Sequence, residues 1–459
     1  MGNTIKFLIL AASWFLLALA ISGPAKTAAA EPTCGPPPPT DAGNPWLADK
    51  PIIGTARPPS HAEGGGDCPF YSNAWQRFLL VTQPDKTTGR PAFLAYASPD
   101  DLFDQPKPKP TCPDGPVLTG GVFQAKSHGI LIDRLGHPVY YDIRADPGFQ
   151  AFLAAKGLHT TGDLQHGIKP DWRFAPGAIE LKSAWQIVDP KAPPSNYFIT
   201  KACVPKLIID KGQVVASTQV VPVTVALLAL HVVFTLDDHP EFIWSTFEHV
   251  GSSGERDNAP AAKSNPSQTA GDTPVSGTDA PLYAANTPPS KANTALTPAD
   301  YAAHFDVATQ TFDVSTPVYR LYPGSKTDAD PAADQDVVDL DNAMGTLFTA
   351  AKLPAADKRK FYQLVGAIWL DNGAALAAGQ SFDLGENEST EHGVLAGEGR
   401  LSSTAMESFT QGVSGFPNCF SCHNTQIIKT DVKPFKLLMA PNAMNVSHFM
   451  SKYLSDQSP

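Results

Sequence analysis

Residues 220–236, VVPVTVALLALHVVFTL, form the stretch of sequence that decides the fold, because they are almost continuously apolar. The run is short for a membrane span, is rich in β-branched residues and lacks positive charge on either flank. It also contains Pro222, Thr224 and His231. The stretch therefore predicts a buried pair of strands, or a strand and a helix, and no stable membrane insertion of the mature chain.

The sequence on either side of this run is typical of strands. The segments ILIDRL and PVYYDI flank a turn at Gly136-His137, GAIELKSAWQIV alternates at its start, and KLIID is followed by KGQ and VVAST. A helix is predicted at SNAWQRFLLV. We therefore expect a β-rich domain over residues 67–250, preceded by a Pro/Gly-rich arm over residues 31–66.

A change of composition after Val250 predicts a domain boundary. Residues 251–296 are rich in Pro, Ser and Ala and read as a linker, and residues 297–459 show helical periodicity. The expected fold class is α+β, with the β-rich domain followed by a mainly α-helical C-terminal domain. Four helices are expected there, of which the first is capped by Thr297-Pro298 and the last is a short one from Thr404 to Gly412. The second has its apolar face along Val337, Leu340, Met344, Leu347, Phe348 and Ala351. The third begins at Pro354 and has its apolar face along Phe361, Leu364, Val365, Ile368 and Trp369.

The first thirty residues have the pattern of a secretory signal peptide, with an early lysine, an apolar run and small residues before Glu31. The expected cleavage follows Ala30 and places the mature chain in the periplasm or another exported compartment. The whole chain carries a formal net charge of −11, and cleavage removes Lys6 and Lys26 but no acid. This acidic balance disfavours nucleic acid and favours basic protein partners.

Four of the six cysteines, Cys34, Cys68, Cys112 and Cys203, lie in the N-terminal half. An even set of cysteines in an oxidising compartment usually pairs, so we expect two disulfides. The spacing leaves all three pairings open.

The other two cysteines, Cys419 and Cys422, stand in the pentapeptide CFSCH, which ends in His423. C-x-x-C-H is the attachment signature of c-type haem, in which two thiols bind the porphyrin edge and the histidine binds the iron. The alternatives are a zinc site, which would need a fourth ligand such as His392 or His448, a redox pair, which is expected in a βαβ unit, and a plain third disulfide. The signature therefore favours one covalent haem per chain.

At these residues the chain resembles the c-type cytochromes, although the match covers five residues and lies near the C-terminus. The segments WQRFLL, GAIELKSAW and FIWSTFEHV are also similar to a family of large exported bacterial single-haem proteins of unsettled function. The first resemblance implies a periplasmic cytochrome that transfers single electrons between protein redox partners. The second implies no mechanism.

The sixth ligand of the iron would distinguish an electron carrier from a catalyst. A methionine suits electron transfer, whereas an open iron suits a peroxidase-like or oxygen-activating enzyme or a sensor. The sequence leaves the ligand open and slightly favours Met406 and Met444. The other candidates are Met439, Met450 and His448.

Two further polar segments have a structural and a functional interpretation. In FIWSTFEHV, Trp244, Glu248 and His249 suit a pocket with an acid/base pair, but we favour a core tryptophan and a Glu248–His249 hydrogen bond at the domain surface. The acidic run that ends in Asp339 and Asp341 lacks the pattern of a calcium loop, so we expect a solvated helix start.

Overall fold

The computed structural model describes residues 34–37, 43–49, 51, 53–104, 109–124, 127–251, 256–262, 272–322, 334–371, 377–381, 389–390, 393–411, 418–430 and 434–457. The expected signal peptide, residues 1–30, lies outside these residues. Cys34–Pro459 form one compact unit.

The centre of the fold is the strand β4, Gln213–Leu236. The prediction of two strands, or of a strand and a helix, over residues 220–236 is wrong, because these residues continue one strand. β2 (Ile179–Ile187) pairs along one edge of β4, and β3 (Ile199–Asp210) and β5 (His239–His249) share the other edge. The middle of β4 is buried on both faces, which explains its continuous apolar sequence.

The remaining strands extend the same antiparallel sheet. Its order is β1-β2-β4-β5-β8-β10-β9, with β3 paired to β4 outside this path. The bounds of the added strands are Tyr140–Ala145 for β1, Tyr362–Leu370 for β8, Ser389–Thr390 for β9 and Gly393–Gly397 for β10. Since β8, β9 and β10 belong to the C-terminal half, the expected mainly α-helical C-terminal domain is wrong.

The clearest error of the sequence analysis is the helix expected after Pro354. Residues Tyr362–Leu370 form strand β8, which pairs with β5 and β10 inside the sheet. Both faces of β8 are covered, so its side chains are buried with almost no alternation, and their spacing imitates a helical face. The short helix expected from Thr404 is also absent from the described residues, where residues 404–411 form turns.

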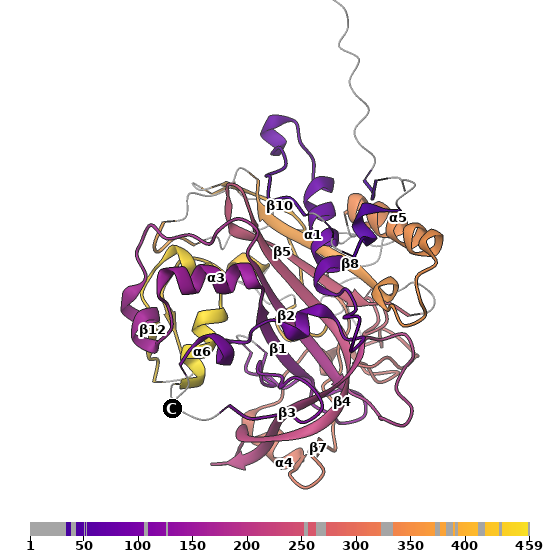
Figure 1. The fold of residues 1–459 in the computed structure, drawn as a ribbon. Coiled ribbons are helices and arrows are strands. Elements are labelled where there is room, and N and C mark those ends of the chain that lie inside the picture. The colour runs from indigo at the N-terminus through magenta and orange to yellow at the C-terminus, as the bar shows by residue number, and fades with distance from the viewer. Residues whose placement is uncertain are drawn as a thin grey trace, which may run out of the picture. The chain divides into compact units, whose positions relative to one another are not determined.

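Three predicted helices are confirmed: α1 (Cys68–Val81), α4 (Pro298–His304) and α5 (Gln335–Ala351). The side chain of Thr297 caps α4 as expected. Helices α1 and α5 contact each other and cover one face of the sheet, whereas α3 (Pro147–Lys156) and α6 (Phe449–Gln457) pack into the apolar cluster on the other face (Figure 1).

The other described elements are short. They are the helix α2 (Pro99–Leu102), the paired strands β6 (Phe305–Asp306) and β7 (Thr311–Phe312), the paired strands β11 (Ile428–Lys429) and β12 (Leu437–Met439), the 3-10 helices η1 (Pro45–Leu47), η2 (His61–Glu63), η3 (Ala92–Ala95), η6 (Pro289–Lys291), η7 (Arg359–Phe361), η8 (Cys419–Ser421) and η9 (Ala443–Val446), and the π-helical turn η4 (Asp163–Gly167).

The described part of residues 251–296, which was expected to be a linker, packs against the sheet. Leu282 and Tyr283 are fully buried, and Asn258 Nδ2 donates a hydrogen bond of 2.9 Å to the carbonyl of Leu228 in β4. A few buried residues therefore hold this segment against the sheet, although most of its residues are small or polar.

Two disulfides are present, as expected, and the structure selects one pairing. Cys34 is joined to Cys68 at the start of α1, which holds the N-terminal arm, and Cys112 is joined to Cys203 in β3. Among the described residues, none of the helices has the length and apolar character needed to cross a membrane.

One acid of the predicted solvated helix start is instead partly buried and hydrogen-bonded. Asp341 in α5 accepts hydrogen bonds from Trp75 Nε1 at 2.9 Å and from the Leu364 amide at 3.2 Å. Burial raises the pKa of Asp341 to about 7, although both hydrogen bonds act in the opposite direction. Asp341 thus ties α1 and α5 to β8 as a carboxyl group that is protonated more readily than an ordinary aspartate.

We predict that this group makes the protein less stable as pH rises. Because the pKa of Asp341 is higher in the folded than in the unfolded chain, the folded chain binds more protons between about pH 4 and pH 7, and the free energy of unfolding falls across that window. Urea unfolding gives the free energy of unfolding at pH 5 and at pH 8. We expect this free energy to fall between the two pH values by about 2–3 kcal/mol less in Asp341→Asn than in the wild type. Asp339→Asn changes an exposed acid of the same helix and is the control, so its free energy of unfolding should fall between pH 5 and pH 8 as much as that of the wild type. If the fall in Asp341→Asn also equals that of the wild type, Asp341 is not the group responsible.

Candidate functional site

The C-x-x-C-H signature folds into a single turn. Cys419 begins the 3-10 helix η8, whose N-cap Asn418 accepts a hydrogen bond from the Phe420 amide. The amides of Cys422 and His423 both donate to the Cys419 carbonyl, at 3.1 and 2.9 Å. The backbone therefore places two thiols one turn apart and the histidine directly after the second.

The ring of His423 is held by contacts on several sides. Its Nδ1 donates a hydrogen bond of 3.0 Å to the carbonyl of Val446, so in the neutral ring the lone pair is on Nε2. The ring centroid lies 3.8 Å from that of Trp244 and 4.0 Å from that of His448. Burial, and then the neighbouring His448, lowers the pKa of His423 well below its ordinary value. The imidazole is therefore neutral, the form that binds metals.

These residues fit a covalently attached haem by their donor chemistry. Metal-binding histidines commonly donate their second ring nitrogen to a backbone carbonyl, as His423 does to Val446. Cys419 and Cys422 are thiols outside the two disulfides, and Cys419 packs against the apolar cluster that contains Phe420. Haem attachment needs this combination of two thiols and one oriented imidazole.

The surroundings of Cys419 weigh against a redox-active pair of thiols. Burial raises the pKa of the Cys419 thiol, whereas a redox-active cysteine needs a lowered pKa. Among the described residues, no group of three or more His, Cys, Asp or Glu side chains is arranged to hold a metal ion. His392, one of the zinc ligands considered, lies outside the described residues.

The turn that accepts the His423 hydrogen bond is itself anchored to the sheet. Ser447, next to Val446, donates to the carboxylate of Glu180 in β2. Glu180 is buried, and burial raises its pKa to about 7. The side-chain nitrogen Nδ2 of Asn445 donates to the carbonyls of Gln426 and Ala440, both at 2.8 Å. The Val446 carbonyl is thus fixed by polar contacts on both sides of it.

A band of polar side chains crosses the face of the sheet beside this site. The register places Lys182, His231 and Thr246 next to one another on β2, β4 and β5. His231 bonds Thr246 Oγ1 through Nδ1 at 2.9 Å and Glu407 through Nε2 at 3.0 Å. Burial raises the pKa of Glu407, but His231, Lys182 and the Ser403 amide together outweigh that effect, and the net pKa is lowered. The Lys182 charge affects the pKa of His423 and Cys419, so the band lies within electrostatic range of the signature.

Sequence reasoning missed Glu180, Lys182 and Glu407. The only available signal was charge within otherwise apolar or alternating strand sequence, as in AIELKSAW. Their proximity to the signature depends on the register of β2 against β4 and on a long-range loop contact, and neither can be read from local sequence.

The segment FIWSTFEHV is part of the site, but in a different way from the one expected. Trp244 is buried, as expected, and contacts His423. The predicted Glu248–His249 hydrogen bond at the surface is wrong, because both residues are fully buried and have other partners. Glu248 accepts from the hydroxyls of Ser403 and Thr404, and His249 bonds Asp257 at 2.7 Å.

The candidate distal methionines fall into two apolar clusters. Met444 belongs to the cluster on which Cys419 packs, together with Met439 and Met450. Met406 belongs to a different cluster, with Leu131 and Val139. The structure therefore brings Met444, and not Met406, into the apolar surroundings of the signature.

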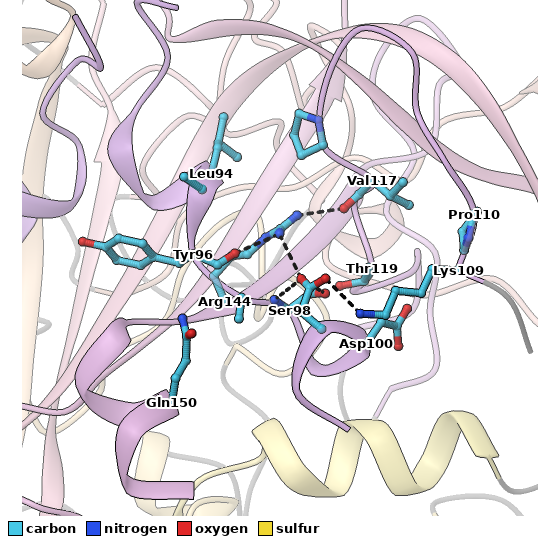
Figure 2. Close-up of a pocket in the computed structure, with 14 residues that line it drawn as sticks. Leu94, Tyr96, Ser98, Asp100, Lys109, Pro110, Val117, Thr119, Arg144 and Gln150 are labelled. Carbon is cyan, nitrogen blue, oxygen red and sulfur yellow. Dashed lines mark hydrogen bonds and ion pairs between the residues drawn. The ribbon is translucent and has the colours of Figure 1, made fainter. Parts of the chain in front are cut away.

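The described residues also line a pocket of about 460 Å³ away from the signature (Figure 2). At its centre, Arg144 donates to the carbonyls of Tyr96 at 3.0 Å and Val117 at 2.8 Å and pairs with Asp142 at 2.7 Å. Each of the three guanidinium nitrogens thus has a partner, which fixes Arg144 in the pocket wall. None of the lining residues belongs to the signature.

Comparison with known proteins adds no relative: no protein-family model, no curated protein and no solved structure matches the chain. The similarity of WQRFLL, GAIELKSAW and FIWSTFEHV to large single-haem proteins therefore stays a prediction.

Asn445 provides a test of how the site is held. Asn445→Ala removes the side-chain donor shared by the Gln426 and Ala440 carbonyls from a fully buried position, and each of the two lost hydrogen bonds is worth about 0.5–1.5 kcal/mol. We expect urea unfolding to show that the free energy of unfolding falls by about 1–3 kcal/mol. Asn424→Ala removes a more exposed hydrogen bond in the same segment and should cost less than about 1 kcal/mol. Equal effects of the two variants would contradict the clamping role.

Proposed function

We propose that the chain is a periplasmic c-type cytochrome that carries one haem on Cys419, Cys422 and His423 and transfers single electrons between protein redox partners. The observation that carries the proposal is the turn with two thiols and an imidazole oriented by the Val446 carbonyl. Bound haem supplies an iron that changes oxidation state by one electron.

The protein's own residues have three tasks in this proposal. Val446 keeps the proton of His423 on Nδ1, which leaves the Nε2 lone pair to hold an iron when haem is bound and increases its basicity. Trp244 and His448 pack against the imidazole and restrict its rotation. Phe420 anchors the signature turn in the apolar cluster, which keeps water from this side of the site.

Met444 is the sixth ligand that we propose. It shares the apolar cluster of Cys419, whereas Met406 does not. His448 is a poorer choice, because its ring packs directly against the His423 ring, with 4.0 Å between the two centroids, and leaves no space for a further group between them. A methionine ligand raises the reduction potential and closes the iron, which suits an electron carrier.

Haem attachment is the first expected outcome. The chain, expressed with a c-type haem maturation system, should carry one haem that stays bound through denaturing electrophoresis and is counted by pyridine haemochrome absorbance. Cys419→Ala/Cys422→Ala should lose that covalent haem. Cys34→Ala/Cys68→Ala removes a cysteine pair elsewhere, so it should keep the haem and lose about 2–4 kcal/mol of stability. A wild-type chain without covalent haem would refute the proposal.

The visible spectrum of the dithionite-reduced protein, before and after carbon monoxide is added, tests the sixth ligand. We expect no change in the wild type and in Met406→Ala, and a carbon monoxide complex in Met444→Ala, because removal of a strong ligand opens the iron. A complex in the wild type would contradict a closed iron.

That last result would favour a second candidate, a haem enzyme or sensor with an open iron. The polar band supports this alternative, because His231 and Glu407 form a hydrogen-bonded acid/base pair within electrostatic range of the signature. Peroxide turnover that is lost in His231→Ala would then be the decisive measurement.

A further inference from the structure

The segment that directly follows the signature forms a small two-stranded sheet with an exposed apolar surface. Strands β11 and β12 pair so that Ile428 and Met439 are partners on the inner side, packed into the core, and Lys429 and Leu437 are partners on the outer side. Three large apolar side chains on this segment are about half exposed: Ile427 at 51%, Phe435 at 50% and Leu437 at 57%.

Lysines surround these apolar side chains. Lys429 and Lys436 are exposed, and Lys429 Nζ lies 4.6 Å from the centre of the Phe435 ring. We call Ile427, Lys429, Phe435, Lys436 and Leu437 the hairpin patch.

A second group of lysines lies on the neighbouring segment. Lys156 and Lys169 lie over the Trp172 ring, at 4.8 and 5.7 Å from its centre. Asn442, just after β12, donates to the Lys169 carbonyl, and β12 contacts the turn η4. Lys156 and Lys169 therefore lie on the segment that adjoins the hairpin patch, on the side of the molecule where Figure 1 places α3 and β12. The carboxylates on this neighbouring segment are Asp163 and Asp171.

The hairpin patch is coupled to the proposed haem ligand by short contacts. Asn445 holds Gln426 and Ala440, the residues at the two ends of the segment, and the next residue, Val446, accepts the hydrogen bond from His423. A protein that docks on the patch would therefore sit beside the signature. This geometry suits electron transfer, in which the partner must approach the haem.

We propose that the hairpin patch is the docking surface for an acidic redox protein. The inference rests on the proposed function and specifies its partner. Exposed apolar side chains among lysines match a partner whose apolar contact region is surrounded by carboxylates. The net charge of −11 alone would select a basic partner, so local and overall charge make opposite predictions.

Small redox reagents separate the local from the overall charge. The dithionite-reduced protein is oxidised with anionic hexacyanoferrate(III) and with cationic tris(phenanthroline)cobalt(III) over a range of ionic strength. We expect the reaction with the anion to slow as salt is added, because the exposed charges of the hairpin patch, Lys429 and Lys436, are positive. Lys429→Glu/Lys436→Glu should reverse the sign of this salt dependence. The control Lys191→Glu/Lys211→Glu makes the same charge change at exposed positions elsewhere and should leave the sign unchanged.

A binding measurement tests the surface without relying on haem. Calorimetry at low salt uses an acidic plastocyanin-type copper protein as the probe and a basic c-type cytochrome as its counterpart. We expect the acidic probe to bind, and Phe435→Ser/Leu437→Ser to bind it about tenfold more weakly. Circular dichroism confirms that the variant is folded.

The outcomes separate the two proposals. A chain without haem refutes the proposed function, while calorimetry still tests the patch. A haem protein whose reaction with the anion accelerates with salt, or which binds only the basic probe, overturns the docking inference and leaves the proposed function standing. The docking inference is also overturned if the wild type, Lys429→Glu/Lys436→Glu and Phe435→Ser/Leu437→Ser all bind the acidic probe equally.

Discussion

The rest of the structure depends on the hydrogen-bonding demand of β4. A buried strand must pair its backbone amides and carbonyls on both edges, and β4 meets this demand with β2 on one edge and with β3 and β5 on the other. Because β8 and β10 then add beyond β5, segments from both halves of the chain share one sheet. The division into a sheet domain and a helical domain that composition suggests cannot be formed with this pairing.

The two faces of the sheet differ in character. One is covered by α1 and α5 over a large apolar core, and the other carries apolar clusters with a polar band between them. Burial of such polar groups is costly unless they pair, and the contact of His231 with Glu407 and of Glu180 with Ser447 meets that condition. The signature turn lies on this second face, where Trp244 reaches it from β5.

The sequence alone predicted those elements whose structure follows from the spacing of neighbouring apolar residues. Helix α5 was predictable because its apolar residues recur at helical spacing and face one core, and β2 because its start alternates. Strand β8 was not predictable, since burial on both faces removes alternation. Asp341 looked like a solvated acid because Trp75, its partner, lies far away in the sequence. For the candidate site, sequence identified the signature, whereas Val446, Glu180 and Trp244 come to it through the tertiary fold.

The positions of the six cysteines have a consequence for maturation. Both disulfides lie within the first 203 residues, and the signature thiols begin at Cys419. In a chain exported N-terminus first, the four disulfide-forming cysteines enter the oxidising compartment long before the last two. They can pair with one another while no competing thiol is present. Under the proposed function, the late pair would then arrive when the other four cysteines are already paired with one another, and its thiols would react with haem and not with them. The order of the cysteines along the chain would thus separate two thiol chemistries in time.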